Sequence, residues 1–310
     1  MKQKVVVFGS FVADLAAKTP HFPAPGETVM GTAVSVANPG GKGSNQAVAA
    51  HRAGADVTMI TKVGKDTFGT IAKDFYAKEG MDSSYMIEDD SLSTGYALIM
   101  IDENTAQNEI VVIIGACDNI TSDDVEKCRS LIESADILLV QLETNFDALF
   151  KVIDIAHKAG VKIVLNPDPA ADLPDEVLRK VDIVTPNETE AQILTGIHVE
   201  TVEDAKKAAA VFMDKGVKEV VITLGSKGAF AMNRERSELV ARLSVDAVDT
   251  TGAGDAFNGG FVTALSEGKD LFEALKFGNV TGALSVTRPG SAIAMPMRKD
   301  IDAFYQENYK

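Results

Sequence analysis

The sequence predicts an α/β fold of the doubly wound type, with a mostly parallel sheet and helices on both faces. Apolar strand-like segments alternate with helix-like segments over most of the 310 residues, which is typical of parallel sheets. Strand-like runs such as Val5 to Phe8 are continuous and β-branched, as expected for strands covered on both sides. Polar residues follow several of these runs, at the edge where open α/β sheets bind ligands.

The N-terminal residues predict one strand of the main sheet and then a change of character. After the strand Val5 to Phe8 comes Asp14, which is either a ligand-facing acid at the strand exit or a solvated loop acid. Thr28 to Ala37 alternates weakly and predicts a strand outside the main core. A Gly-rich loop over 38–46 then opens a helix over 47–53, which ends at a glycine.

A predicted hairpin completes a small second sheet. Two alternating runs, 96–101 and 109–114, are joined by a polar loop. Together with 28–37 they form a sheet whose apolar face needs cover, so we expect a lid and a homodimer surface. The expected lid comprises about residues 10–40 and 95–115 of a single domain over 1–310. Before the hairpin, 57–63 predicts a strand and 67–78 a helix.

From residue 120 onward the alternation of helix and strand becomes regular. The expected helices are 123–132, 146–157 and 202–215, and the expected strands are 137–142, 162–166, 183–185 and 219–224. Polar residues at the strand exits are Asp14, Glu143, Asn187, Glu190 and Gly225. This pattern predicts a binding edge at the carboxyl ends of the strands.

The last strand-to-helix unit carries the residues with the clearest chemical pattern. Leu243 to Val248 predicts a strand, Asp249 to Asp255 a Gly-rich turn, and 256–265 a helix, followed by helices over 271–286 and 299–305. N–H groups at such a helix start bind anions. An acid beside an anion site indicates a base, so Asp255 would take a proton from an attacking hydroxyl. The alternative is a structural turn with an acid favoured by the helix dipole.

The first Gly-rich loop predicts contact with a polyhydroxylated ligand. Gly40, Gly41 and Gly43 allow close backbone approach, and Lys42 supplies a charge. The loop is not a nucleotide-binding Walker A loop, because Gly43 follows the lysine where Ser or Thr is required. A purely structural turn is the alternative.

Composition excludes several classes of function. The formal net charge of −15, with no basic patch, argues against nucleic-acid binding. Cys117 and Cys128 suit neither a disulfide framework nor a zinc site. No apolar run approaches the length of a membrane span, and the residues before Val5 are too few for a signal peptide. We therefore expect a cytoplasmic protein without a membrane partner.

Five segments resemble motifs of the ribokinase-type (PfkB) carbohydrate kinases. Residues 38–46 resemble their N-terminal signature, and residues 249–255 resemble their C-terminal signature. Residues 186–190 resemble their N-x-x-E motif, and residues 141–143 and 166–170 resemble two connecting segments. The motifs occur in the right order and the resemblance covers residues 9–296. It implies a ribokinase-like fold and transfer of the γ-phosphate of ATP to the 5-hydroxyl of a pentose.

The resemblance also implies roles for individual residues. Asp255 would be the catalytic base, and the N–H groups of Gly252, Ala253 and Gly254 would hold the developing charge. The residues that would hold the sugar are Asp14, Gly40, Gly41, Lys42, Asn45 and Glu143. The residues that would line the nucleotide site are Asn187, Thr223, Gly225, Lys227, Gly228, Gly254 and Asn279.

Two kinds of cation are implied by the same resemblance. Glu190 would help to order Mg²⁺ and its waters; the alternative is an acid of a first helical turn. A monovalent cation, usually K⁺, would be held near Asp249, Thr251, Ser285, Arg288, Gly290 and Ala294. Ala294 has no side-chain oxygen where ribokinases often have Ser, so we expect one ligand of that site to be lost or replaced by water.

Val12 departs from the family pattern and leaves the sugar open. An amide residue is usual there, and an apolar side chain facing the sugar would leave a hydroxyl unpaired, at about 1–3 kcal/mol. The 2-deoxyribokinase members also carry an apolar residue at this place. Ribose and 2-deoxyribose are therefore both expected candidates, and fructose- or nucleoside-type kinases are less favoured alternatives. A non-catalytic sugar sensor is the rival class, disfavoured because Gly252, Gly254 and Asp255 are all present.

Overall fold

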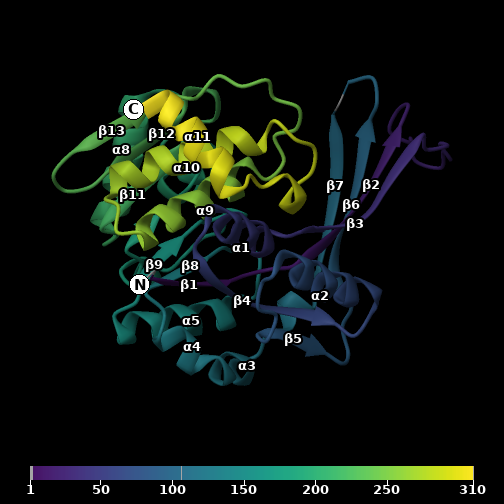
Figure 1. Cartoon of the computed structure of the whole chain (residues 1–310), viewed down its shortest axis with the longest axis horizontal. Helices are drawn as coiled ribbons and strands as arrows, with labels where there is room; N and C mark the ends of the chain where they lie inside the picture. Colours follow the sequence, from purple (N-terminus) through teal and green to yellow (C-terminus); the bar gives the residue numbers. More distant parts are fainter. Residues whose placement is uncertain (1–2, 106, 310) are drawn as a thin grey trace.

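The computed structural model describes residues 3–105 and 107–309. In this part of the chain, nine strands form a large sheet in the order β13-β12-β11-β10-β9-β8-β1-β4-β5 (Figure 1). The strands from β11 to β5 pair in parallel, and β12 and β13 form an antiparallel hairpin at one edge. These strands are β1 (Lys4–Phe8), β4 (Asp56–Gly64), β5 (Met86–Asp89), β8 (Ile137–Val140), β9 (Lys162–Leu165), β10 (Ile183–Val184), β11 (Glu219–Thr223), β12 (Ala229–Met232) and β13 (Ser237–Val240). The predicted fold class is confirmed.

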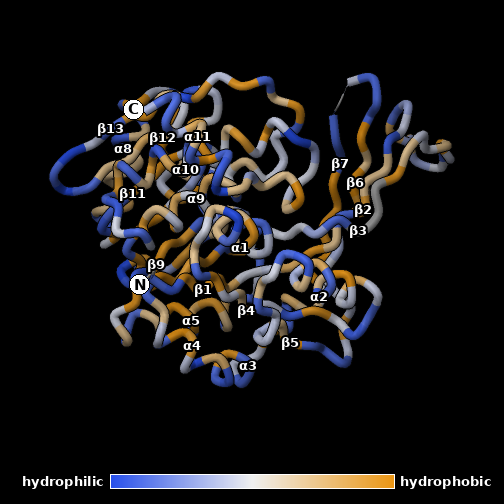
Figure 2. The backbone as a smooth tube through the Cα atoms, in the orientation of Figure 1, coloured by the Kyte–Doolittle hydropathy of each residue, from blue (hydrophilic) through white to orange (hydrophobic). Residues whose placement is uncertain are grey.

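Helices cover both faces of this sheet because successive side chains of each strand point to opposite sides. Val5 and Val7 belong to one apolar core, whereas Val6 and Phe8 belong to the other. The first core contains residues of α1 (Lys42–Ala53), α2 (Thr67–Glu79), α9 (Ala253–Ser266), α10 (Leu271–Ser285) and α11 (Arg298–Tyr309). The second contains residues of α3 (Ser122–Lys127), α4 (Arg129–Glu133), α5 (Phe146–Ala159), α6 (Asp175–Leu178), α7 (Glu188–Thr195) and α8 (Val202–Asp214). Figure 2 shows apolar residues gathered along the central strands and the helices beside them. No helix of the described residues is long and apolar enough to cross a bilayer.

A small four-stranded sheet projects from the main body, as expected (Figure 1). Its order is β3-β2-β6-β7, with β2 (Val12–Thr19), β3 (Ala33–Gly40), β6 (Thr94–Asp102) and β7 (Asn108–Gly115). The predicted hairpin is confirmed, since β6 and β7 pair antiparallel. Residue 106, in the loop that joins them, lies outside the described residues.

Two expectations about the small sheet were wrong in their limits. Asp14 lies inside strand β2, a strand that was not predicted, and neither just past β1 nor in a loop. The strand expected over 28–37 instead runs from Ala33 to Gly40. Pro39 fits there because β3 is an edge strand, where a residue without an N–H leaves no ladder bond unmade.

The ends of the two Gly-rich segments form the first turns of helices. Helix α1 begins at Lys42, five residues earlier than predicted, and α9 begins at Ala253 instead of residue 256. The strand predicted over Leu243 to Val248 was wrong, since these residues form no strand. The hairpin β12–β13, which was not predicted, occupies that edge of the sheet. The helix expected over 123–132 is divided into α3 and α4 at Cys128, and strand β5 was also missed.

Candidate functional site

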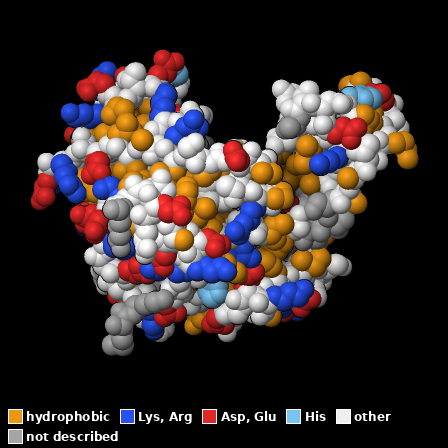
Figure 3. Space-filling model, turned by 45° about the horizontal axis from the view of Figure 1, so that its top comes forward, with side chains coloured by type: hydrophobic (Ala, Val, Ile, Leu, Met, Phe, Trp, Pro, Cys, Tyr) orange, Lys and Arg blue, Asp and Glu red, His pale blue; other side chains and the backbone are white. Residues whose placement is uncertain are grey.

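The carboxyl ends of the central strands lead into a cavity of about 550 Å³. Figure 3 shows the surface hollowed between the main body and the projecting small sheet. Residues from distant segments meet in this cavity, among them Lys42, Asp168, Asn187, Glu188, Thr223, Gly225, Ser226, Gly228, Ala229, Arg242, Leu243, Val245, Ala247, Thr250, Gly252, Ala253, Gly254, Asp255, Phe257, Asn279, Gly282, Ala283 and Val286. A cavity therefore lies at the predicted binding edge.

The start of α9 presents bare N–H groups to this cavity. Gly252 is the N-cap, with a left-handed φ of 73° that favours glycine, and no side chain caps the helix. The N–H groups of Gly252 and Gly254 donate to no other described residue, whereas that of Ala253 donates to the carbonyl of Thr250 at 3.2 Å. No atom lies within 4 Å of the position that a Cβ on Gly254 would take. The helix start thus offers free donors and open space to an anion.

Asp255 follows in the first turn of α9 and is buried, with 8% of its surface exposed. Its carboxylate accepts hydrogen bonds from the side-chain amides of Asn45 and Gln46, each at 2.9 Å. Burial raises the pKa of Asp255 to about 6, although Lys42, Gln46 and Asn45 act in the opposite direction. A carboxylate with such a pKa can accept a proton near neutral pH.

Lys42 connects three of the acidic residues around the cavity. Its ammonium lies 2.7 Å from Asp168, and its backbone N–H donates to Glu143 at 2.9 Å. The hydroxyl of Ser10 donates to the same Glu143 carboxylate. Burial alone would lower the pKa of Lys42, but the carboxylates of Asp255, Asp168 and Glu143 raise it overall. The lysine therefore remains a cation within the site.

Asp14 faces inward from strand β2. It accepts a hydrogen bond from the hydroxyl of Ser291 at 3.0 Å, and a Cβ on Gly40 would lie 2.5 Å from its carboxylate. Burial raises the pKa of Asp14 to about 6, with the Ser291 hydrogen bond lowering it and Glu143 raising it. Gly41 is required because its φ is 84° and a Cβ would lie 2.7 Å from the Val12 nitrogen.

Val12 lies on the same face of β2 as Asp14, because side chains two residues apart in a strand share a face. Its exposed fraction is 2%, and it pairs with Gly40 and Gly95 on the neighbouring strands. A residue at position 12 is thus placed beside the Asp14 carboxylate.

Asn187 and Glu190 form the capping box of α7. The Asn187 side chain accepts from the Glu190 N–H, and the Glu190 carboxylate accepts from the Asn187 N–H, both at 2.9 Å. Glu190 is therefore an acid of a first helical turn, which was one of its two expected roles. Burial and the neighbouring Asp168 raise the pKa of Glu190 to about 8. The Glu190 carboxyl can therefore hold a proton near neutral pH, because another carboxyl group lies beside it.

The part of the cavity next to β11 combines glycine turns with an apolar wall. Thr223, Gly225, Gly228 and Asn279 line it, as expected for the nucleotide side. Lys227 is not among the lining residues, since its ammonium donates to the carbonyl of Glu200. The apolar wall includes Leu243, Val245, Ala247, Ala283 and Val286. The alternating run that wrongly predicted a strand therefore serves to line the cavity.

The segments proposed for a monovalent cation come together beside the start of α9. The Asp249 carboxylate accepts from the N–H groups of Gly290 and Thr251, each at 2.9 Å, and the Asp249 N–H donates to the carbonyl of Val286 at 3.1 Å. Burial raises the pKa of Asp249, but these two N–H groups outweigh burial and lower it. Ser285 and Ala294 are buried, whereas Arg288 pairs with Asp300 at 3.2 Å.

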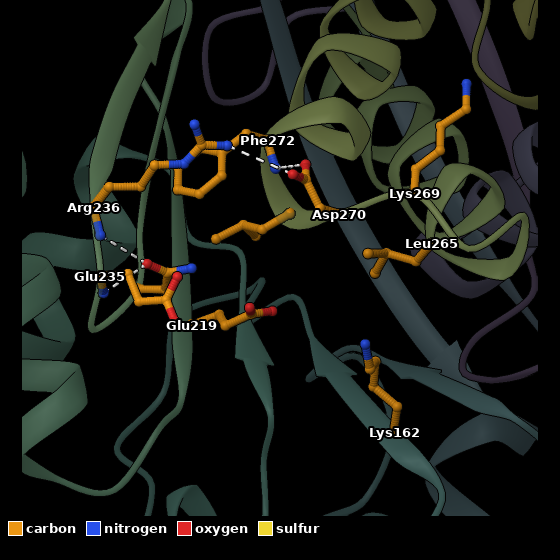
Figure 4. A pocket seen from close by; sticks show the side chains of 10 residues that line it. Lys162, Glu219, Glu235, Arg236, Leu265, Lys269, Asp270 and Phe272 are labelled. Atoms are coloured by element: carbon orange, nitrogen blue, oxygen red, sulfur yellow. Dashed lines mark hydrogen bonds and ion pairs between the residues drawn. The ribbon is translucent and has the colours of Figure 1, made fainter.

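A second cavity, of about 510 Å³, lies at the opposite edge of the sheet (Figure 4). Lys162 and Glu219 are the first residues of β9 and β11, so this cavity is remote from the carboxyl edge. Some of the charged groups beside it pair with their neighbours. Arg236 lies over the ring of Phe272 and 3.5 Å from Asp270.

Sequence reasoning missed several residues that the fold brings to Asp255 and Asp14. They are Gln46, Gln141, Asn166 and Ser291, with Arg242 lining the cavity. Gln46, Gln141 and Asn166 stand inside recognised motif segments, and that position was the only available signal. Nothing local distinguishes Ser291 or Arg242.

Comparison with known proteins gives concordant results. The model for "pfkB family carbohydrate kinase" matches residues 2–298. A ribokinase of Haemophilus influenzae is 44% identical over 99% of this chain and 99% of its own length. A deoxyribokinase of Salmonella typhi is 34% identical over 98% of this chain and 99% of its own length. The solved structure of Arabidopsis thaliana ribokinase complexed with ribose and ATP has a TM-score of 0.90 and 32% identity, covering 99% of each chain.

The half-buried carboxylate of Asp14 should lower stability at neutral pH. Its pKa is about 6 in the folded protein and near 3.8 in the unfolded chain, so any stability it contributes is lost as the pH rises through 6. Replacement by asparagine keeps an acceptor for Ser291 and removes the charge. Asp14→Asn should therefore raise the free energy of unfolding by about 1–3 kcal/mol at pH 7.5, and by little at pH 4, in urea titrations. Asp246→Asn, at an exposed position, is the control, and an equal effect of Asp14→Asn at both pH values would contradict this account.

Proposed function

This chain belongs to the pfkB family of carbohydrate kinases, and we propose that it is a ribokinase that phosphorylates the 5-hydroxyl of D-ribose with ATP. Membership makes it a phosphotransferase acting on a sugar alcohol. The choice of ribose is supported by the 44% identity to the Haemophilus influenzae ribokinase. The observation that carries the proposal is the buried Asp255 carboxylate beside the free N–H groups of Gly252 and Gly254 in one cavity.

In the proposed reaction Asp255 accepts the proton of the sugar 5-hydroxyl while that oxygen attacks the γ-phosphorus of ATP. The bond from the γ-phosphorus to the bridging oxygen breaks, and ADP leaves with the electron pair. The N–H groups of Gly252, Ala253 and Gly254 stabilise the charge on the transferred phosphoryl group. Ala253 contributes only after its N–H leaves the Thr250 carbonyl, to which it donates here.

The two substrates are assigned to neighbouring parts of the site. The sugar is assigned to the small-sheet side, where the candidate contacts are Asp14, Gly40, Gly41, Lys42, Asn45 and Glu143. ATP is assigned to the side near β11, where the apolar wall suits a flat base and the candidate contacts are Asn187, Thr223, Gly225, Gly228 and Asn279. In this assignment Lys227 contributes its backbone, within the turn from Gly225 to Gly228, and its ammonium does not contact ATP.

The proposal includes Mg²⁺ and a monovalent cation. Mg²⁺ bridges phosphate oxygens and keeps several waters, and the crowded carboxylates of Glu190 and Asp168 fit an outer role in holding those waters. K⁺ would lie near Asp249 and the carbonyls of the 285–294 segment. There it would order the loop that leads into α9, and the Asp249 carboxylate with the lowered pKa suits a cation.

Replacement of the proposed base tests the catalytic assignment. Asp255→Asn keeps the side-chain volume but cannot accept the hydroxyl proton, so kcat should fall by roughly 10²–10⁴-fold. The dissociation constant for ribose, measured by calorimetry, should change little. Asp246→Asn serves as the control, and turnover like that of the wild type in Asp255→Asn would remove Asp255 from this role.

A 2-deoxyribokinase is the second candidate, favoured by Val12. An isopropyl group on the Asp14 face of β2 cannot pair with a sugar hydroxyl, and the chain is 34% identical to a Salmonella typhi deoxyribokinase. We expect kcat/KM to be higher for ribose, and Val12→Asn to raise the ribose-to-deoxyribose ratio further, by about 5- to 150-fold for 1–3 kcal/mol. Each assay is run with and without K⁺, and K⁺ should raise the turnover.

The same assays decide between the candidates. A preference for 2-deoxyribose in the wild type would replace the first assignment with the second. No turnover with either sugar would overturn both and would direct attention to other furanose sugars, nucleosides, or a sensor.

The small sheet is proposed to close over the sugar and to join two copies of the chain. Its exposed apolar residues, with exposed fractions of 45–72%, lie on both faces: Val34, Leu98 and Val111 on one, and Ile110 and Val112 on the face of Asp14. Such a patch is typical of an interface. Val111→Lys should therefore convert a dimer into monomers in sedimentation experiments, whereas Ile193→Lys, at an exposed position on α7, should not. A wild-type protein that sediments as a monomer at assay concentrations would contradict the dimer.

A further inference from the structure

The Asp255 carboxylate rests on buried carboxamides that the proposed reaction does not use. We propose that Gln46 is a positioning residue, fixed by Gln141 and Asn166, that holds Asp255 in its ionised form and in one orientation. This inference rests on the proposed role of Asp255 as the base. Gln46 and Gln141 are fully buried, and Asn166 has an exposed fraction of 5%.

The Gln46 amide uses its donors and its acceptor within the protein. Its Nε2 donates to Asp255 Oδ1 at 2.9 Å and to Asn166 Oδ1 at 2.8 Å, which uses both of its hydrogens. Its Oε1 accepts from Gln141 Nε2 at 2.6 Å. Gln46 therefore holds the carboxylate of the proposed base through a hydrogen bond and has no donor left for a ligand.

The direction of every amide in this chain of hydrogen bonds is fixed by groups that can only accept. The Asp255 carboxylate stands at one end, and the backbone carbonyl of Thr185, which accepts from Asn166 Nδ2 at 3.1 Å, stands at the other. A flipped Gln46 would turn its oxygen toward a carboxylate. A flipped Asn166 would turn its oxygen toward a carbonyl. The network therefore has one polarity, and this polarity matches an unprotonated Asp255.

Protonation of Asp255 on the oxygen facing Gln46 would disrupt this arrangement. The new O–H would oppose the Gln46 N–H, and rotation of the Gln46 amide would break its hydrogen bonds to Asn166 and Gln141. Asn45 Nδ2 occupies the other oxygen at 2.9 Å. The charged groups facing Asp255 are Lys42, which favours ionisation, and Asp168, which opposes it.

The orientation of Gln141 leaves one of its own polar atoms without a hydrogen bond. Its Oε1 is buried and has no hydrogen-bond partner among the described residues, which is unfavourable for a buried acceptor. A Cβ on Gly9 would lie 2.1 Å from this oxygen, so the amide is also packed against the turn after β1. Gln141 is thus held with its N–H groups toward Gln46.

The test is the pH dependence of kcat/KM for the sugar from pH 5 to 9, which reports the free enzyme. Gln46→Met keeps the side-chain length and removes the donors. The acid limb should move to higher pH by about 1, so that a roughly fivefold loss at pH 6 is largely recovered at pH 9. Gln141→Met, which does not touch Asp255, should move the limb in the same direction by less. Gln192→Met, at an exposed glutamine, is the matched control.

Two outcomes would overturn the inference. One is activity lost equally at every pH in Gln46→Met, and the other is an acid limb that stays in place in both variants. If Gln46→Met does not fold, as judged by thermal melting, Gln141→Met decides by the same criterion. Normal turnover in Asp255→Asn would defeat the proposed function, whereas an inactive Asp255→Asn with an unmoved limb in the glutamine variants would defeat this inference alone.

Discussion

The central constraint on this structure is an ionisable carboxyl group that is buried at the start of a helix. Burial disfavours the ionised form of Asp255, whereas the surrounding groups favour it: Lys42, two side-chain amides and the N-terminus of α9. These groups come from α1 and α9, and Gln46 is in turn held by Gln141 and Asn166, which follow β8 and β9. The main sheet must therefore be folded before the Asp255 carboxylate has the partners that favour its ionised form. Stability and chemistry depend on the same contacts here, as is common for perturbed groups in sites.

The region around the Asp255 carboxylate holds more acids than it can keep charged. Asp14, Glu143, Asp168 and Glu190 surround one ammonium, that of Lys42. Burial raises the pKa of Asp14 and Glu190 to about 6 and 8, so protons occupy part of the cluster near neutral pH. An anionic substrate then meets a less negative site than the residue count implies. This is also why the formal net charge of −15 does not conflict with binding of a nucleotide.

Local patterns were enough to predict the fold class, the projecting hairpin and the edge that carries the site. They failed where the same pattern serves another purpose. Leu243 to Val248 alternates like a strand, yet alternate residues line a cavity. The amide network was not predictable, because Gln46 reaches residues 95, 120 and 209 positions away. Such contacts depend on the order of the strands in the sheet, and no local spacing encodes them.

Val12 and the residues of the amide network differ in how easily they can be substituted without loss of the contacts to Asp255. Val12 lies on β2 beside Asp14 and contributes nothing to the bonds that hold Asp255. Under the role proposed for Val12, a substitution there alters which hydroxyl is matched while the contacts to Asp255 stay intact. Gln46 contacts three partners at once, so a change there has to be compensated elsewhere. If Val12 sets the sugar preference as proposed, a duplicated copy of this chain changes that preference by substitution at position 12 and keeps the contacts to Asp255 throughout.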